Sequence, residues 1–165
     1  MTVGSIKENI NIERRVAITL ESAKNIIALG LNINLEKNYA NHLGINDKQF
    51  EELGVRFYDS SSEVIDNSRL LLKVNCPSDE EIKSLKEKTI LVGIFNPTKN
   101  ENKLKEILKK NVSIFSLELL PRISRAQSMD VLSSQSNLAG YRAVIESIYE
   151  FEKAVPMMMT AAGTV

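Results

Sequence analysis

Short apolar runs alternate with amphipathic stretches along most of this chain. The runs predict strands, and they lie at residues 2–7, 31–35, 55–58, 70–74, 89–95 and 112–119. The stretches between them space their apolar residues at the helical period. They predict helices, which lie at residues 19–29, 46–54, 64–65, 78–87 and 103–110. Because strands and helices alternate with short links, the pattern predicts an α/β fold with a mostly parallel sheet flanked by helices.

Local signals support this order of elements. A serine or asparagine followed three residues later by Glu or Gln forms a capping box, and such boxes begin at Asn46, Ser60 and Ser78. The runs 70–74 and 89–95 show little polar alternation, as expected for parallel strands that are buried on both faces. We therefore expect a Rossmann-like or flavodoxin-like lobe.

The C-terminal part of the chain has a different pattern. A polar stretch follows the last predicted strand, and a longer helix is predicted from about Ser134 to Ala154, with Pro156 ending it. One apolar stripe runs along this helix and consists of Leu138, Tyr141, Val144, Ile145, Ile148 and Phe151. The pattern predicts two regions: residues 1–133 as an N-terminal α/β lobe, and residues 134–165 as a long connecting helix with the start of a second lobe.

Composition narrows the classes of function. The 165 residues are 43% hydrophobic and 25% charged, and 21 basic residues balance 21 acidic ones, which gives no electrostatic footprint for nucleic acid. Cys76 and His42 are the only cysteine and histidine, so neither an intramolecular disulfide nor a zinc or iron site is expected. No signal peptide and no membrane-spanning run is visible, which makes the cytoplasm the expected compartment.

Two basic residues near predicted strand ends are open to more than one interpretation. Ligands of parallel sheets bind beyond the carboxyl ends of the strands, where Lys73, Asn75 and Asn96 are expected. Lys73 is either the last, solvated residue of its strand or a group that points into a cleft. Arg15 is either a loop cation or a clamp for an anion. Both are retained as weak candidates for a substrate pocket.

The polar stretch offers a more specific set of groups. Arg122, Gln127, Asp130 and Ser133 supply the donors and acceptors that a carboxamide needs. The alternative is a loop that is stabilised by its own side-chain hydrogen bonds. No two of the seven glycines are separated by one residue, so the chain contains neither a G-x-G-x-x-G fingerprint nor a P-loop.

These residues also carry a resemblance to a known family. Residues 121–130 (PRISRAQSMD) and 132–141 (LSSQSNLAGY) closely resemble the nicotinamide loop of the alpha subunit of the proton-translocating NAD(P) transhydrogenases. Shorter similarities lie at residues 6–8, 15–19, 72–77 and 160–163. The resemblance covers nearly the whole chain.

The resemblance implies a role for each polar residue. Arg122 and Ser133 would hold the nicotinamide carboxamide, Asp130 would help to fix the ring, and Gln127 would lie between the two nicotinamides during hydride transfer. Gln127 and Asp130 are therefore the expected catalytic residues. The chain would be the first lobe of the NAD(H)-binding component, with the glycine-rich lobe following Val165, and would be inactive by itself.

The resemblance also implies an assembly. NADH would reduce NADP, bound on a partner beta component, and a membrane proton channel would couple this reaction to proton translocation. The partners would thus be the remaining NAD-binding lobe, the NADP(H)-binding component and the channel, with the complete component as a homodimer. The chain would be cytoplasmic and peripheral to the inner membrane through its partners, with no role in nucleic-acid binding.

Two other functions remain as alternatives. The related alanine dehydrogenases share the positions of Arg15 and Lys73, where they bind pyruvate, but they also use a histidine where this chain has Asn96. Oxidative deamination needs a proton acceptor, whereas hydride transfer between two nicotinamides needs proximity and orientation. The histidine-poor sequence therefore favours transhydrogenation. The third possibility is a non-catalytic, truncated remnant or effector lobe.

Overall fold

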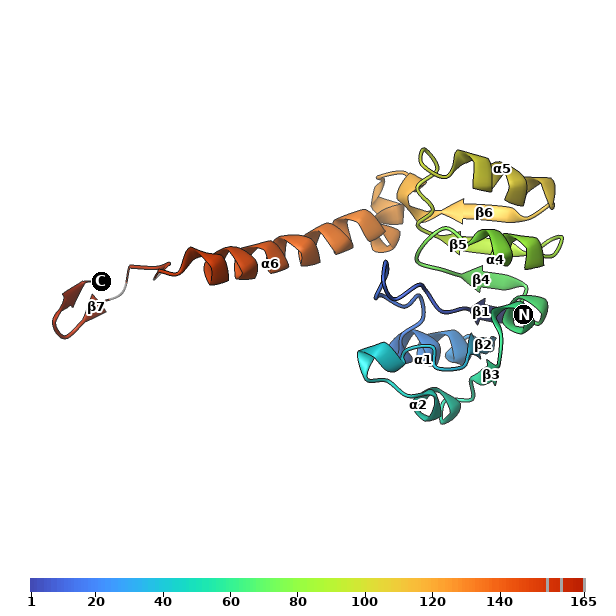
Figure 1. The fold of residues 1–165 in the computed structure, drawn as a ribbon, viewed down its shortest axis with the longest axis horizontal. Coiled ribbons are helices and arrows are strands. Elements are labelled where there is room, and N and C mark those ends of the chain that lie inside the picture. Colours follow the sequence, from blue (N-terminus) through green and yellow to red (C-terminus); the bar gives the residue numbers. More distant parts are fainter. Residues whose placement is uncertain (154, 158, 165) are drawn as a thin grey trace. The chain divides into compact units, whose positions relative to one another are not determined.

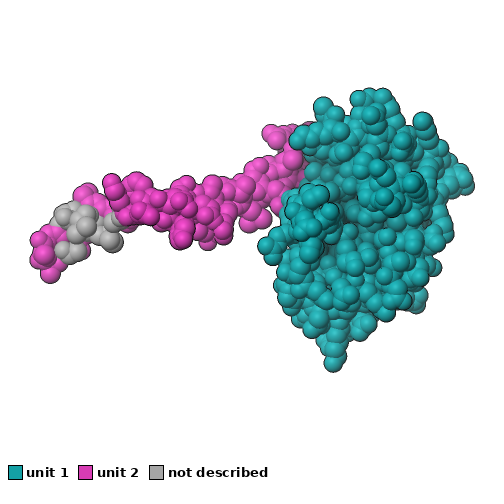
Figure 2. Space-filling view, in the orientation of Figure 1, with its two compact units in different colours: residues 1–120 teal, residues 121–165 magenta. Residues whose placement is uncertain are grey.

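The structure is a computed structural model that describes residues 1–153, 155–157 and 159–164, with only the backbone described for Thr160 and Thr164. It divides into two compact units, Met1–Leu120 and Pro121–Val165 (Figure 2). The predicted division of the chain into residues 1–133 and 134–165 stays a prediction.

A six-stranded parallel sheet forms the centre of the first unit (Figure 1). All neighbouring pairs are parallel, in the order β3-β2-β1-β4-β5-β6. The strands are β1 (Thr2–Ser5), β2 (Asn32–Glu36), β3 (Arg56–Tyr58), β4 (Leu70–Leu72), β5 (Ile90–Gly93) and β6 (Ser113–Ser116). This is the strand order of a doubly wound Rossmann-type sheet. The predicted α/β fold with a mostly parallel sheet is confirmed.

Helices cover both faces of the sheet, and each helix fills the gap between two strands in the chain. They are α1 (Leu20–Ala28), the 3₁₀ helix η1 (Asn41–Leu43), α2 (Asp47–Glu51), α3 (Ser61–Asp66), α4 (Asp79–Ser84) and α5 (Glu101–Lys109), with the 3₁₀ helix η2 (Leu117–Leu119) after β6. Successive strand residues point to opposite faces. In β4, Leu71 therefore packs with α3, α4 and α5 while Leu70 and Leu72 pack with α1 and α2.

Several predicted boundaries are wrong by a few residues. The strand predicted over 112–119 ends at Ser116 and continues as η2, and the helix predicted over 78–87 ends at Ser84. The capping boxes at Asn46 and Ser78 are confirmed. At Ser60 the side chain caps α3, but Glu63 accepts its hydrogen bond from the backbone of Asp59, so the reciprocal half of the box is absent.

The second unit contains a 3₁₀ helix, a long α-helix and a short hairpin. These elements are η3 (Ser124–Met129), α6 (Val131–Phe151), and the antiparallel pair β7 (Met159–Thr160) and β8 (Gly163–Thr164). Helix α6 begins three residues before the predicted Ser134, because Asp130 is its N-cap. It ends at Phe151, before Pro156, with Glu152 in a left-handed conformation (φ 54°). The predicted last residue, Ala154, lies outside the described residues.

A buried chain of hydrogen bonds joins the strand ends in the first unit. The Ile18 N–H donates to the Tyr39 hydroxyl at 3.0 Å. The same hydroxyl lies 2.8 Å from Ser5 Oγ. Ser5 in turn donates to the Leu72 carbonyl at 2.8 Å. Burial raises the pKa of Tyr39 to about 12. These bonds connect the carboxyl ends of β1 and β4 with the segments that flank β2.

We predict that Tyr39→Phe destabilises the protein by about 1–3 kcal/mol, because the Ile18 N–H and Ser5 Oγ each lose a buried partner. The folded-state pKa of Tyr39 lies above its unfolded value of 10, so its stabilising effect is present below pH 10 and is lost as the pH rises towards 12. Urea denaturation of both proteins across this range measures the effect. A difference in free energy of unfolding that stays constant from pH 9 to 12 would contradict the assignment.

Candidate functional site

The sheet places its topological switch point between β1 and β4. The chain leaves β1 towards α1 on one face and leaves β4 towards α4 on the other, which opens a crevice at the carboxyl ends. A cavity of about 570 Å³ lies at this edge of the sheet. Its walls come from the segments that follow β1, β4 and β5, and they include Glu8, Lys73, Asn75 and Asn96.

Lys73 is a buried cation that is held between two carboxylates. Its Nζ lies 2.9 Å from Glu81 Oε2, 3.0 Å from Glu81 Oε1 and 3.8 Å from Glu8 Oε2. The side chains of Lys73 and Glu8 are 6% and 5% exposed. Lys73 is therefore not a solvated strand end; it lies in the wall of the cavity, and its role in a substrate pocket stays a prediction.

Backbone groups hold the two carboxylates as well. Glu8 Oε1 accepts the Val74 N–H at 2.7 Å, and Glu81 Oε2 accepts the Ser78 N–H at 2.8 Å as part of the capping box. Burial raises the pKa of Glu8, although the Lys73 charge and the Val74 N–H act in the opposite direction. Glu8 was not among the residues predicted from the sequence, and Glu81 was assigned to helix capping alone. The signals for Glu8 are its place just after the first strand and the similarity to the family at residues 6–8.

Because Gly93 of β5 has no Cβ, the backbone of Lys73 can lie close to this strand. A Cβ at this position would be 2.3 Å from the Lys73 carbonyl oxygen. The same stretch is fixed by the hydrogen bonds from Lys73 N to Val92 O and from Ile94 N to Val74 O, both 3.0 Å. The lysine is thus positioned by main-chain contacts to β5 and not by its ion pairs alone.

Arg15 forms an ion pair with Glu13, which lies two positions before it in the sequence. Its Nε and a terminal nitrogen donate to Glu13 at 2.9 and 2.7 Å. The hydrogen bonds between the two side chains lower the pKa of Glu13 and raise that of Arg15. Arg15 is not among the residues that line the cavity beside Lys73. The charge of Glu8, which lines that cavity, also contributes to the raised pKa of Arg15.

The remaining candidates for acid–base or thiol chemistry have structural explanations. Asn96 borders the cavity in a left-handed conformation (φ 48°), and its N–H donates to Glu118. His42 lies in η1, and its Nε2 is 2.7 Å from the Arg14 carbonyl oxygen. Burial raises the pKa of Cys76, which favours the thiol over the reactive thiolate. Among the described residues, no cluster of three or more acidic, His or Cys side chains could hold a metal ion.

In the second unit, the polar stretch forms η3 and the start of α6. Asp130 Oδ1 accepts the Ser133 N–H at 3.0 Å, and Asp130 Oδ2 accepts the Ser133 hydroxyl at 2.6 Å. These two bonds, with a smaller effect of the Arg122 charge, lower the pKa of Asp130. Arg122, Gln127 and Ser133 are exposed. The loop is thus stabilised by its own side chains, while its binding role stays a prediction.

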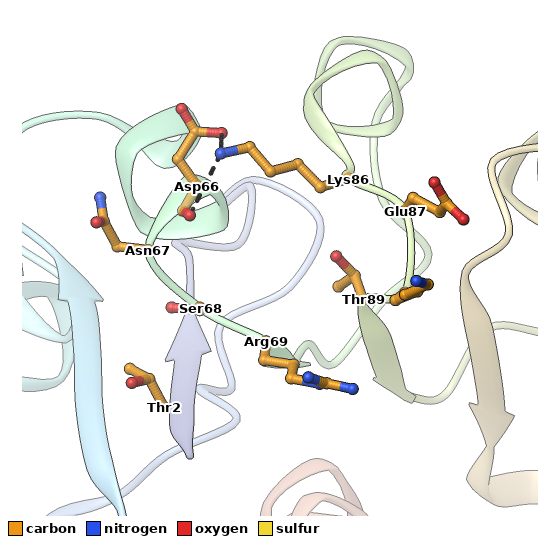
Figure 3. Close-up of a pocket in the computed structure, with 9 residues that line it drawn as sticks. Thr2, Asp66, Asn67, Ser68, Arg69, Lys86, Glu87 and Thr89 are labelled. Atoms are coloured by element: carbon orange, nitrogen blue, oxygen red, sulfur yellow. Dashed lines mark hydrogen bonds and ion pairs between the residues drawn. The ribbon is translucent and has the colours of Figure 1, made fainter.

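A second cavity, of about 400 Å³, lies at the opposite, amino-terminal edge of the sheet (Figure 3). Thr2, Arg69 and Thr89 line it, and Figure 3 shows Lys86 reaching across to Asp66, with a distance of 2.9 Å between Nζ and Oδ1. Its basic and acidic side chains largely offset each other, so it offers no clear preference for a ligand charge.

No described helix is both long and apolar enough to cross a bilayer.

Comparison with known proteins identifies close relatives. The family model for the alanine dehydrogenase/PNT N-terminal domain matches residues 4–139. An NAD(P) transhydrogenase alpha-subunit protein of Rickettsia prowazekii is 41% identical over 170 aligned residues, which cover 100% of this chain and 44% of that protein. The solved structure of a transhydrogenase from Sinorhizobium meliloti matches with a TM-score of 0.91 at 41% identity, over 100% of this chain and 49% of that one.

A solved L-alanine dehydrogenase is more distant. It matches with a TM-score of 0.67 at 18% identity, over 72% of this chain and 32% of that one. This likeness concerns the fold alone. The chain spans less than half the length of the curated transhydrogenase relatives that it matches.

We predict that Lys73→Met costs about 3–5 kcal/mol of stability at neutral pH, because it leaves the buried Glu8 carboxylate and the half-buried Glu81 carboxylate without their cation. The loss should shrink as the pH falls, since protonation removes the unpaired charges. Lys86→Met is the matched control: it breaks the exposed Lys86–Asp66 pair and should cost about 1 kcal/mol or less. Equal midpoints of urea unfolding for the two variants would contradict the role of Lys73.

Proposed function

Because this chain belongs to the family of alanine dehydrogenase/PNT N-terminal domains, we propose that it is the N-terminal lobe of the NAD(H)-binding component of an NAD(P) transhydrogenase. The proposed activity of the whole assembly is hydride transfer from NADH to NADP coupled to proton translocation. The proposed cofactor of this component is NAD(H), and NADP(H) is bound by a partner component. The isolated chain contributes only one wall of the cofactor site.

The observation that carries this proposal is the set of polar groups before and at the start of α6. Arg122 can only donate hydrogen bonds, and ionised Asp130 can only accept them. A carboxamide needs both kinds of partner, for its oxygen and for its amide hydrogens. This set therefore fits the nicotinamide end of a dinucleotide. It does not fit the pyrophosphate, for which the chain lacks a glycine-rich cradle.

The proposed mechanism assigns separate tasks to these residues. Arg122, Asp130 and Ser133 would hold and orient the nicotinamide, and the Gln127 side chain would lie between the two nicotinamides. Bound NADH supplies the hydride. No proton acceptor is needed for this transfer, and proximity and orientation of the two rings set the rate. The one histidine, His42, contacts a backbone carbonyl and has no role in the mechanism.

The alternative of an amino-acid dehydrogenase lobe is less well supported. A lysine that clamps a substrate carboxylate needs an available charge, and Lys73 already contacts Glu8 and Glu81. An incoming carboxylate would have to compete with the carboxylates of Glu8 and Glu81. Asn96, at the edge of the same cavity, cannot act as the proton acceptor that oxidative deamination needs.

The remaining elements of the proposed site belong to partners. We propose that a second lobe supplies the pyrophosphate cradle, and that the complete component is a homodimer held at the inner membrane, on the cytoplasmic side, by the NADP(H)-binding component and the proton channel. Helix α6 supports an additional packing partner, because its apolar stripe is exposed. Leu138, Tyr141 and Val144 are 60%, 70% and 59% exposed.

We predict that Gln127→Asn, in the complete component, slows hydride transfer to an NADP analogue while leaving the dissociation constant of NADH nearly unchanged. Shortening this side chain alters its position between the rings but removes no contact that holds the cofactor. Stopped-flow absorbance of mixed components measures the rate, and calorimetry measures the dissociation constant. An unchanged rate, or alanine-dependent reduction of NAD by the same component, would contradict the proposed function.

We predict that Arg122→Ala weakens NADH binding by roughly 10- to 100-fold, the worth of a hydrogen bond to a charged group. Arg125→Ala is the matched control, because Arg125 is an exposed arginine on η3 with no assigned contact to the cofactor. Calorimetric titration of both variants separates a local contact from a general loss of positive charge. Equal effects of the two changes would remove Arg122 from the site.

A further inference from the structure

We propose that the uncovered face of β5 and β6 is a docking surface for one amphipathic helix, and that the remaining part of the complete component supplies this helix. Three apolar side chains, Ile90, Val92 and Phe115, form this face, which we call the open strip. The inference concerns a surface of the first unit and not the proposed cofactor site. It takes from the proposed function only that a longer component exists.

The two faces of β5 and β6 differ in how they are covered. On one face, Leu91 is fully buried, and Ile114 packs against the same core as α3, α4 and α5. Successive strand residues point to opposite faces, so Ile90, Val92 and Phe115 point the other way. The register places Val92 opposite Phe115. Phe115 is 56% exposed, and the three side chains belong to neither hydrophobic core of the first unit.

The order of the elements explains why the open strip lacks a helix layer. Helices α1 and α2 pack on β1, β2 and β3, and their core extends as far as Leu70 and Leu72 of β4. Helices α4 and α5 pack on the opposite face of the sheet. Within the first unit, no described helix therefore covers the open strip. Because parallel sheets bury both faces under helices, this half of one face is incomplete.

The dimensions and chemistry of the open strip suit one helix. Neighbouring strands lie roughly 4.8 Å apart, so a face two strands wide spans about 10 Å, the diameter of one helix with its side chains. A helix satisfies its own backbone hydrogen bonds and needs only apolar contacts. The strip offers these contacts, with Ser113 opposite Ile90 as its polar corner. The occupant is therefore a helix with apolar residues spaced three and four apart.

The small size of the open strip argues against a second copy of this chain as the occupant. A stable interface between separate proteins involves roughly 20–30 residues from each partner, whereas the strip offers three apolar side chains. A helix within the same polypeptide needs less contact area, because its tether gives an effective concentration of about a millimolar. The transhydrogenase relatives are more than twice as long as this chain, so they contain further segments that include room for such a helix.

Cysteine labelling measures whether the open strip is covered. In a Cys76→Ser background, Phe115→Cys provides the only thiol in residues 1–165. Leu108→Cys is the matched control, because Leu108 is 57% exposed but lies on α5, on the opposite face of the sheet. A maleimide should react with the two thiols at similar rates in this chain. Protection at position 115 that appears in this chain alone as its concentration rises would indicate a second copy and overturn the inference.

The same two positions are then labelled in the complete component, with the products read by mass spectrometry of peptides. Position 115 should react at least about tenfold more slowly than in this chain, because a docked helix must first open locally, while position 108 should be unchanged. An unchanged rate at position 115 would overturn the inference. Equal protection of both positions would also overturn it, since the whole lobe would then be screened and not the strip.

Photo-crosslinking identifies the occupant. With p-benzoylphenylalanine in place of Phe115, the complete component should form adducts at residues three or four apart in one segment outside residues 1–165. Adducts with α6, or with a second copy of the component, would overturn the assignment. The outcome is separable from the proposed function: protection at position 115 in a component that binds no NADH would leave the docking surface standing and remove the proposed function. Hydride transfer without protection would do the reverse.

Discussion

The carboxyl edge of the sheet depends on the ion pairs that the Lys73 ammonium group forms. It joins Glu8, from the segment after β1, to Glu81, from the first turn of α4. These segments flank the switch point of the sheet, where the chain departs to opposite faces. The buried Glu8 carboxylate beside the half-buried Glu81 carboxylate would be unfavourable without this cation. The same contacts fix the wall of the cavity. They also offset the positive charge of Lys73, which a substrate carboxylate would need as its partner.

The two candidate sites of this chain differ in how their polar groups are satisfied. Around Lys73, ion pairs and backbone hydrogen bonds engage the buried charged groups, which indicates a structural role for the cluster. At the start of α6, the bonds between Asp130 and Ser133 satisfy the helix terminus but leave Arg122 and Gln127 exposed. Exposed donors beside an ordered acceptor are the more suitable arrangement for recognising a polar ligand.

Helix capping and ligand recognition are compatible in this loop. A capping residue must hold its side chain in one orientation, because it accepts the hydrogen bond of an N–H in the first turn. That orientation is also what a recognition site requires. The observation that Asp130 is the N-cap of α6 therefore does not compete with a role in cofactor binding. Capping by Asp130 explains why α6 has an ordered start at the place where the sequence resembles a nicotinamide loop.

Hydrophobic periodicity and capping signals act over a few residues, so the α/β class, the order of the elements and the polar loop follow from the amino-acid sequence. The predictions fail at element ends: Ser116 ends the strand predicted to reach Leu119, and α6 starts at Val131 because Asp130 caps it. The strand order and the partners of Lys73 depend on the folded structure. Glu8 precedes that lysine by 65 positions, and no local pattern indicates that the ends of β1 and β4 lie side by side. Such contacts depend on which strands become neighbours, and this is set by packing of the whole sheet.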